Sequence, residues 1–298
     1  MRPKTKIVVT GSGGFLGSYL LKRIEKGDHK VLALMRDTKG RVNSKTVRYI
    51  KCDIAKDDLS PYLKNADFVF HLAAIKPEGS DISEEDCTKN IEMAHNLASS
   101  NKKAKVIYAS TNNVYGTPAK IPITESDPVR PTEHYGMSKL CGEVILDFFS
   151  RKRGWPLAVL RIANVYGPEA QRKEGALFNF FSKLKTDSPL EIVGDGSQRR
   201  DRVWVEDVTR AFALAMSEDA AGVFNIGSGR SYSTIEVAKM IGKLLHKKPQ
   251  FVFKKNAAPQ KKEILLDIGR AKKILGYHPR TDFKKGLAIL IKKWNETR

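Results

Sequence analysis

The sequence has few cysteines and no long apolar segment, and both scarcities restrict what the protein can be. The three cysteines among 298 residues, Cys52, Cys87 and Cys141, are odd in number and widely spaced. They predict neither a disulfide framework nor a CxxC metal pair. No apolar stretch is long enough to span a bilayer, and the run at residues 7–9 is too short for the core of a signal peptide. We therefore expect a cytoplasmic protein.

The signatures of several enzyme classes are absent as well. None of the six histidines lies in an HExxH or CxxC…H pattern, so we expect no metal site. The sequence contains neither a G-x-S-x-G elbow nor a G-x-x-x-x-G-K-[ST] loop. This absence argues against the common forms of serine hydrolase and P-loop nucleotidase.

Acidic residues are in deficit, with 33 Asp and Glu against 53 Lys and Arg, which gives a formal net charge of +20. The positive charge is spread along the chain without the interleaved aromatics of a nucleic-acid groove, so we do not expect a nucleic acid as partner. We interpret it first as a lysine-rich solvated surface and second as steering of an anionic substrate. The densest basic stretch, residues 247–255, includes Phe251 and Phe253. Their alternation predicts a strand at the surface with charged flanks and one buried face.

Short apolar segments alternate with helical spacing over the first 165 residues. Strands are expected at 6–10, 30–35, 47–52, 67–72, 104–109 and 157–162, and helices at 15–26, 82–100 and 133–153. This alternation predicts a doubly wound, Rossmann-type α/β fold with a parallel sheet. We expect residues 1–165 to form mainly the dinucleotide-binding domain. Residues 166–298 should form mainly a smaller C-terminal α/β substrate-binding lobe, with some segments returning to the Rossmann domain.

The first strand leads into a glycine-rich turn, TGSGGFLG, at residues 10–17. Glycines here permit a tight turn and close approach of a pyrophosphate, whose charge the following helix N-terminus attracts. We predict that the turn binds a dinucleotide through the following residues: Gly11, Gly13, Gly14, Phe15, Leu16 and Gly17.

The ends of the next strands bear on which dinucleotide is bound. Arg36 stands where an acid would accept the ribose hydroxyls of NAD, and its guanidinium suits the 2′-phosphate of NADP. Asp37 follows directly and is close enough to reach the ribose, so NAD(H) and NADP(H) both remain candidates. Asp53 follows the third strand and is predicted either to meet the adenine or to be an ordinary loop acid.

The segment HYGMSK, residues 134–139, places Tyr135 and Lys139 four residues apart and so on one face of a helix. A free tyrosine has a pKa near ~10 and is a poor base at neutral pH. An adjacent ammonium and an oxidised nicotinamide would lower that pKa and make the phenol a general acid and base. Ser110 and Thr111, at the end of a strand, supply hydroxyls that can orient the reacting group.

Eight ordered motifs, taken together, resemble the extended short-chain dehydrogenase/reductases of the NAD-dependent epimerase/dehydratase family, over nearly the whole chain. The matching segments are TGSGGFLG (10–17), FHLAA (70–74), ASTNNVYG (109–116), YGMSK (135–139), LRIANVYGP (160–168), GDGSQRRDRVWVEDV (194–208), FNIGSG (224–229) and LGYHP (275–279). The resemblance implies a hydride-transfer enzyme acting on a nucleotide-sugar, and homodimers are common among its members.

The resemblance also implies roles for individual residues. Tyr135 would be the catalytic acid/base, and Lys139 would lower its pKa and hold the nicotinamide ribose. Thr111 would be the catalytic hydroxyl, with Ser110 as the neighbouring alternative. Substrate contacts are implied for Thr111, Asn164 and Arg200, the last through the diphosphate. Further cofactor contacts are implied for Ile54, Leu72, Ala73, Ala74, Asn90 and Ile162.

Two departures from the family pattern limit the reaction. Asn112 and Asn113 stand where the dehydratases have an Asp-Glu pair, and amides cannot move the protons of a 4,6-dehydration. The stretch 256–262 lacks a further phosphate-binding arginine that many epimerases carry, and offers Lys261 and Lys262 instead.

Three functions follow from these patterns. The first is a nucleotide-sugar epimerase that oxidises and re-reduces one carbon, C4 being the expected one. The second is an NADP-dependent reductase of a keto-sugar or another carbonyl. The third is a non-catalytic dinucleotide sensor or nucleic-acid-associated protein, against which the intact Tyr135 and Lys139 argue.

Overall fold

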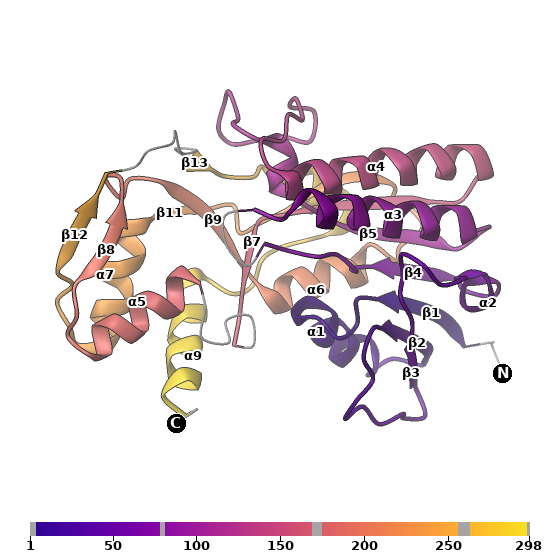
Figure 1. Cartoon of the computed structure of the whole chain (residues 1–298), viewed down its shortest axis with the longest axis horizontal. Helices are drawn as coiled ribbons and strands as arrows, with labels where there is room; N and C mark the ends of the chain where they lie inside the picture. The colour runs from indigo at the N-terminus through magenta and orange to yellow at the C-terminus, as the bar shows by residue number, and fades with distance from the viewer. Residues whose placement is uncertain (1–3, 78–80, 169–174, 256–262, 297–298) are drawn as a thin grey trace.

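A seven-stranded parallel sheet forms the centre of the computed structural model, which describes residues 4–77, 81–168, 175–255 and 263–296 (Figure 1). Its strands are β1 (Thr5–Thr10), β2 (His29–Met35), β3 (Val47–Lys51), β4 (Phe68–His71), β5 (Lys105–Thr111), β6 (Leu157–Ile162) and β10 (Gly222–Ile226). The order is β10-β6-β5-β4-β1-β2-β3, and all neighbouring strands run parallel. The strand order reverses beside β1, as in a doubly wound Rossmann fold, so the predicted fold class is confirmed.

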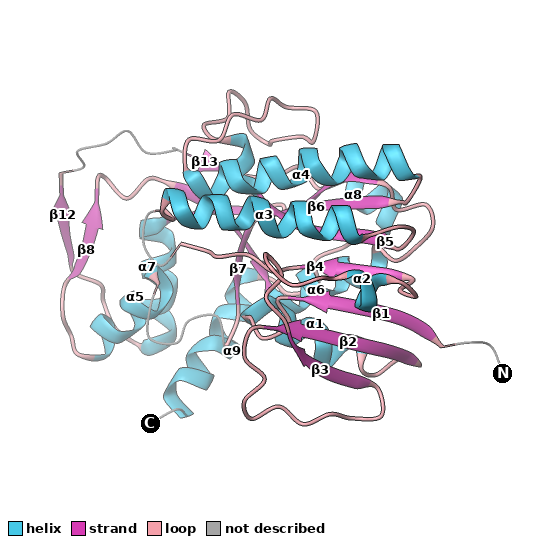
Figure 2. Cartoon of the chain, turned by 45° about the vertical axis from the view of Figure 1, so that its right-hand side comes forward, coloured by secondary structure: helices cyan, strands magenta, loops and turns pink. Residues whose placement is uncertain are grey.

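Helices cover both faces of this sheet. They are α1 (Phe15–Ile24), α2 (Ser60–Leu63), α3 (Glu84–Ser100), α4 (His134–Arg153), α6 (Val205–Leu214) and α8 (Gly269–Leu275). In Figure 2, α3 and α4 lie side by side over one face, and α1 and α6 lie together on the other. The alternation along β1 divides the core accordingly, because Ile7 and Val9 pack with Leu20 of α1 whereas Val8 packs with Leu97 of α3.

The second half of the chain builds a smaller lobe with its own core. Its strands and helices are β7 (Asn164–Tyr166), α5 (Ala176–Lys185), β8 (Leu190–Val193), β9 (Arg199–Trp204), β11 (Ser231–Ser233), α7 (Thr234–Leu245), β12 (Phe251–Lys254), β13 (Glu263–Ile264) and α9 (Phe283–Glu296). Phe181 of α5, Ile241 of α7 and Leu290 of α9 meet in that core. The expected strand at Phe251 is present as β12, but Phe253 is 54% exposed, so the strand is less buried than its alternation predicted.

Segments of this second half also return to the large sheet. Strand β10 extends the sheet at β6, helix α6 packs on α1, and helix α8 packs on β10. The chain therefore crosses between the two cores more than once. The division of roles at residue 165 stays a prediction.

Every strand and helix that the sequence predicted for the first 162 residues is present, with ends that differ by at most two residues. The sequence analysis missed two short helices, α2 and the 3-10 helix η1 (Asn112–Tyr115). Along the part of the chain that the structure describes, no helix is both long and apolar enough to cross a membrane. Over the same residues, no three His, Cys, Asp or Glu side chains gather where they could hold a metal ion.

Candidate active site

The glycine turn after β1 is held in close contact with the loop after β4. Gly11 has φ +68°, and a Cβ on it would lie 2.6 Å from the backbone nitrogen of Ala73. A Cβ on Gly17 would lie 2.3 Å from the carbonyl oxygen of Gly11, so helix α1 can approach the turn only with glycine there. The amide of Ala73 also donates to the Thr10 hydroxyl at 3.2 Å.

The N-terminus of α1 is open and uncharged. Gly14 is its N-cap and offers no side chain to the first N–H groups, and no acid lies in the first turn. Gly13 and Gly14 are both exposed. Unpaired N–H groups, the positive end of the helix dipole and the missing side chains together fit an anionic pyrophosphate. Gly11, Gly13, Gly14, Phe15, Leu16 and Gly17 thus form the surface that the sequence assigned to the dinucleotide.

The other predicted cofactor residues lie along the same edge of the sheet. Thr10 pairs with Leu34 on one side and with His71 on the other, so β1, β2 and β4 end at one level. The residues that follow these strands and β3 are Arg36, Asp53, Ile54, Leu72, Ala73 and Ala74. Asp53 also accepts a bond from the amide of Ala55 at 3.0 Å, which is the behaviour of a loop acid. Arg36 is exposed.

Helix α4 presents Tyr135 in its first turn, and two features that the sequence analysis missed fix that turn. The carboxylate of Asp81, in the loop before α3, accepts the amides of His134 at 2.6 Å and Tyr135 at 3.0 Å. Gly136 allows close packing, because a Cβ on it would lie 2.7 Å from the carbonyl oxygen of Asn113. The first turn of α4 therefore packs against η1, the short helix that directly follows Thr111. Nothing in the local sequence around Asp81, which precedes α3, indicates that it caps α4. Gly136, next to Tyr135, could have indicated that another segment packs closely against α4.

Lys139 is buried one turn further along α4. Its ammonium nitrogen lies 4.1 Å from the centre of the Tyr108 ring, on which His71 stacks from β4. Burial lowers the pKa of Lys139 to about 7, although the Glu143 carboxylate acts in the opposite direction. Burial and the Lys139 charge lower the pKa of His71 to about 3, so this imidazole is neutral and bonds to the Thr10 hydroxyl at 2.7 Å.

Lys139 by itself does not lower the pKa of the Tyr135 phenol, contrary to that part of the prediction. Burial raises the pKa of Tyr135 to about 12, and Lys139 does not offset this rise. A lysine whose own pKa is about 7 is only partly protonated at neutral pH, so its positive charge is reduced. The spacing of four residues correctly predicts a shared helix face, but burial decides the direction of both pKa shifts.

The two candidate hydroxyls at the end of β5 have different surroundings. The Ser110 hydroxyl donates to the buried carboxylate of Glu143. Thr111 is the last residue of β5 and its hydroxyl donates to the side chain of Asn112 at 3.3 Å and accepts the amide of Asn113 at 3.3 Å. Because Ser110 is occupied by a carboxylate, the geometry favours Thr111 as the catalytic hydroxyl. Ile162 lies beside Thr111 in the neighbouring strand β6.

A buried ion pair lies behind these hydroxyls. Glu143 of α4 binds Arg161 of β6 at 2.7 Å, and both side chains are 7% exposed. Arg161 also donates to the Tyr115 hydroxyl at 3.1 Å, and Tyr115 donates to Asn225 of β10 at 2.8 Å. The network ties α4 to the sheet and so fixes the helix that carries Tyr135. Glu143 lies four residues after Lys139, and this spacing was the one signal that could have revealed it.

Asn90 has a scaffolding position. Its side chain bonds to both the amide (2.7 Å) and the carbonyl (2.9 Å) of Ile75, in the loop after β4. It also donates to the Ser138 hydroxyl at 3.2 Å. Asn90 therefore links the loop that bears Ala73 and Ala74 to the helix that bears Tyr135.

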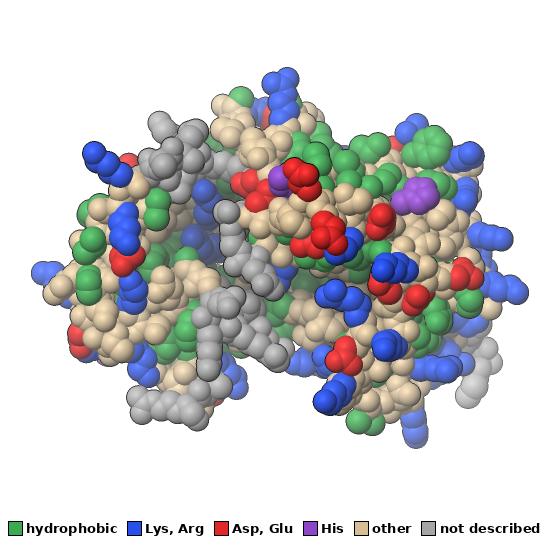
Figure 3. All heavy atoms as spheres, viewed as in Figure 1, with side chains coloured by type: hydrophobic (Ala, Val, Ile, Leu, Met, Phe, Trp, Pro, Cys, Tyr) green, Lys and Arg blue, Asp and Glu red, His purple; other side chains and the backbone are tan. Residues whose placement is uncertain are grey.

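Of the three predicted substrate residues, Thr111 lies on β5 of the large sheet, and Asn164 and Arg200 lie on the small lobe. Asn164, on β7, is exposed and pairs with β9, which carries Arg200. Burial lowers the pKa of Arg200, while the charge of Glu133 raises it. Glu133 precedes α4 by one residue, so Arg200 faces the end of the helix that holds Tyr135. Figure 3 shows a hollow between the small lobe and the main body, lined in part by basic side chains, which we call the cleft.

Comparisons with known proteins agree with this geometry. The model of the NAD dependent epimerase/dehydratase family matches residues 7–227. A putative UDP-glucose 4-epimerase of Methanocaldococcus jannaschii is 31% identical, over 96% of this chain and 97% of that protein. The UDP-glucuronic acid 4-epimerase of Bacillus cereus, solved with UDP-glucuronic acid and NAD, has a TM-score of 0.89 at 28% identity, over 99% of this chain and 100% of the other. A UDP-glucose 4-epimerase of Thermotoga maritima, solved with UDP-glucose, gives 0.87 at 29% identity, over 98% and 99%.

The family match covers most of the chain, and the relatives match over nearly their whole length. The glycine turn, the Tyr135–Lys139 helix and the hydroxyls of β5 occupy one edge of a Rossmann sheet. This chain is an enzyme of the NAD-dependent epimerase/dehydratase family.

Proposed function

We propose that the chain is an NAD-dependent nucleotide-sugar epimerase that inverts C4 of the sugar. The observation that carries this proposal is the position of Tyr135, Lys139 and Thr111 beside a dinucleotide-binding turn. The putative UDP-glucose 4-epimerase and the two solved UDP-sugar 4-epimerases described above support the class of substrate. Residues 1–165 would then bind mainly the cofactor, and residues 166–298 mainly the sugar nucleotide.

The proposed chemistry divides between cofactor and protein. When bound, oxidised NAD supplies a hydride acceptor and a positive charge that favours the phenolate. Tyr135 accepts the proton of the sugar hydroxyl as that carbon is oxidised and returns it when the opposite face is reduced. Thr111 orients the hydroxyl, Lys139 holds the ribose, and Asn164 and Arg200 hold the rest of the substrate.

The residues after Thr111 argue against dehydration by this chain. Asn112 is 5% exposed, and its side-chain oxygen accepts a hydrogen bond from the Thr111 hydroxyl. The side-chain amide of Asn113 donates to the Glu133 carboxylate at 3.3 Å. Neither amide can act as the acid or base that eliminates water. Epimerisation requires only the single phenol that the site provides.

The test is turnover without added reductant. Purified protein should interconvert UDP-glucose and UDP-galactose, or another C4-epimeric pair of UDP-sugars, with only catalytic NAD, as followed by chromatography. Stoichiometric consumption of NADPH without epimer formation would instead establish the keto-sugar reductase and contradict the epimerase. Binding of DNA or RNA with a steep salt dependence and no turnover would support the non-catalytic alternative.

We also propose that the enzyme is a homodimer formed through α3 and α4. The outer face of α4 exposes three apolar side chains, Met137 (42%), Val144 (62%) and Phe148 (51%). Their spacing of seven and four residues puts them on one stripe of the helix. A pocket of about 610 Å³ is lined mainly by α3 residues between 88 and 99, most of them polar, together with Ala55 and with Ile145 of α4. Two such faces would cover each other by two-fold symmetry.

Charge placed in this stripe should break the dimer. The variant Val144→Glu/Phe148→Glu should be monomeric in light scattering, whereas Phe253→Glu, an exposed aromatic on β12, should leave the mass unchanged. A monomeric wild-type protein would contradict the dimer proposal.

A further inference from the structure

Strand β9 carries three arginines whose side chains divide between the two faces of its sheet. Because successive side chains of a strand point to opposite faces, Arg200 and Arg202 share one face and Arg199 lies on the other. Arg202 is paired in register with Asn164 of β7, and Arg200 with Tyr232 of β11. Arg202 therefore shares a face with Asn164 and Arg200, two of the residues predicted to bind the substrate.

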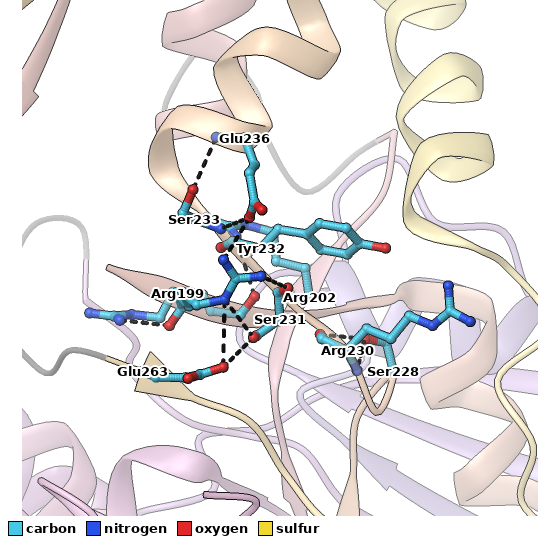
Figure 4. Close-up of polar contacts among 10 residues, drawn as sticks. Arg199, Arg202, Ser228, Arg230, Ser231, Tyr232, Ser233, Glu236 and Glu263 are labelled. Atoms are coloured by element: carbon cyan, nitrogen blue, oxygen red, sulfur yellow. Dashed lines mark hydrogen bonds and ion pairs between the residues drawn. The ribbon is translucent and has the colours of Figure 1, made fainter. Parts of the chain in front are cut away.

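Arg199 is neutralised on its own face. Its guanidinium forms ion pairs with Glu236 at 2.9 Å and Glu263 at 3.6 Å, and it donates to the carbonyl oxygen of Ser231 at 2.8 Å (Figure 4). These partners come from α7, β13 and β11, so Arg199 joins the elements of the small lobe. Its role is explained by the folded structure.

The partners of Arg202 are different in kind. Its Nη1 donates to the main-chain carbonyl oxygens of Arg200 at 3.4 Å and Tyr232 at 3.2 Å. Its guanidinium carbon lies 5.9 Å from the centre of the Phe283 ring. Among the described residues it forms no ion pair with a carboxylate, and its Nε and Nη2 have no acceptor. Those two nitrogens carry three N–H groups.

The two cations of this face also act on each other. Burial lowers the pKa of Arg202 to about 10 and the charge of Arg200 adds to that effect, while Asp201 and Tyr166 offset only part of it. Both groups remain protonated at neutral pH, so like charges are held in a partly desolvated place. Arg202 thus carries a largely desolvated charge that forms no ion pair among the described residues, and a bound anion would stabilise it.

We propose that Arg202 is a second anion-binding arginine of the cleft, which binds the diphosphate of the nucleotide-sugar together with Arg200. This inference rests on the proposed function, which supplies the diphosphate. Residues two apart on a strand are about 7 Å apart, a span that two long arginine side chains close toward adjacent phosphates. The planar guanidinium forks would bind the phosphate oxygens with charge-assisted hydrogen bonds.

The experiment measures anion binding by calorimetry with two probes, UDP and inorganic pyrophosphate, which carries the anion without a nucleoside. Arg202→Met should weaken both about 10- to 100-fold, the value of a hydrogen-bonded charge. Arg202→Lys should fall between Arg202→Met and the wild type. Arg199→Met, one residue away on the opposite face, should stay within about twofold of the wild type.

Thermal unfolding of the same variants separates binding from a structural role. Arg202→Met should keep or raise the Tm, because it removes an uncompensated cation, whereas Arg199→Met should lower it. The inference is overturned if Arg202→Met leaves UDP affinity within about twofold of the wild type, or if the wild type binds neither probe. It is also overturned if Arg202→Met lowers the Tm and weakens UDP binding no more than Arg199→Met does.

A third set of titrations separates the diphosphate from a sugar carboxylate. If Arg202→Met weakens UDP-glucuronic acid but not UDP or UDP-glucose, Arg202 binds the sugar acid and the diphosphate assignment is wrong. If the wild type epimerises no sugar but Arg202→Met still weakens UDP selectively, the inference stands and the proposed function fails. If the wild type epimerises and Arg202→Met has an unchanged KM, the inference alone fails.

Discussion

On the sheet side of the cleft, charged groups are buried together with their partners. Glu143 pairs with Arg161, and Lys139 lies over the Tyr108 ring with a lowered pKa. On the lobe side, β9 holds Arg200 and Arg202 on one face, and among the described residues Arg202 donates only to main-chain carbonyl oxygens. The sheet side thus fixes the position of a phenol, whereas the lobe side, as we propose, binds an anion. Substitutions on the two sides should therefore change different quantities.

Tyr135→Phe gives the largest expected effect on this contrast. The variant lacks the proton-transfer hydroxyl, so kcat for epimerisation should fall by about 10²- to 10⁴-fold, while NAD and UDP affinities stay near those of the wild type. Steady-state kinetics and calorimetry measure the two quantities separately. Turnover close to the wild-type value would show that another group transfers the proton.

Breaking the buried pair tests whether the sheet side depends on compensated charge. Glu143→Gln leaves Arg161 buried without its carboxylate and should lower the free energy of unfolding by about 3–5 kcal/mol. Glu143→Gln/Arg161→Met should recover much of that loss in urea denaturation. The exposed pair of Glu85 and Lys89 is the control, since Glu85→Gln should cost less than about 1 kcal/mol. Equal losses for the two pairs would contradict the assigned role of burial.

Lys139 sharpens the comparison through pH. Its folded-state pKa is about 7 against an ordinary 10.5, so burying the protonated form destabilises the protein fully below pH 7. That penalty shrinks as pH rises from 7 to 10.5, because only the unfolded chain still binds the proton there. Lys139→Met should therefore raise the Tm most at pH 6 and little near pH 10. The gain in the free energy of unfolding at pH 6 should be at most about 5 kcal/mol.

Thermal scans at several pH values check this expectation, with the exposed Lys103→Met as the control. A pH-independent effect of Lys139→Met, or a loss of stability at pH 6, would mean that burial does not destabilise the protonated amine of Lys139.

The smallest expected effect lies away from both sides, at the exposed Arg36. Arg36→Glu should weaken NADP binding by about tenfold more than NAD binding if the guanidinium meets the 2′-phosphate. Fluorescence titration with both cofactors measures the ratio. Equal losses for the two cofactors would remove Arg36 from cofactor selection.

Sequence reasoning predicted the main strands of the sheet and identified Tyr135, Lys139 and the glycine turn. These features depend on local spacing, because alternation, helical period and a turn of glycines act within a few residues. It could not separate Ser110 from Thr111, since the carboxylate that occupies Ser110 comes from a helix 33 residues away. It also missed Asp81, which caps a helix 53 residues later.

The sequence by itself therefore determined the succession of strands and helices over the first 162 residues and the glycine turn, and it predicted the acid/base, since each is carried by contiguous residues. Only the tertiary structure decided the direction of the pKa shifts of Tyr135 and Lys139, because burial comes from segments that are distant in the chain. It also decided which arginine of β9 is neutralised, since Glu236 and Glu263 reach Arg199 only after the lobe has folded. The same folding leaves Arg202 on the face of its sheet that Arg200 and Asn164 share.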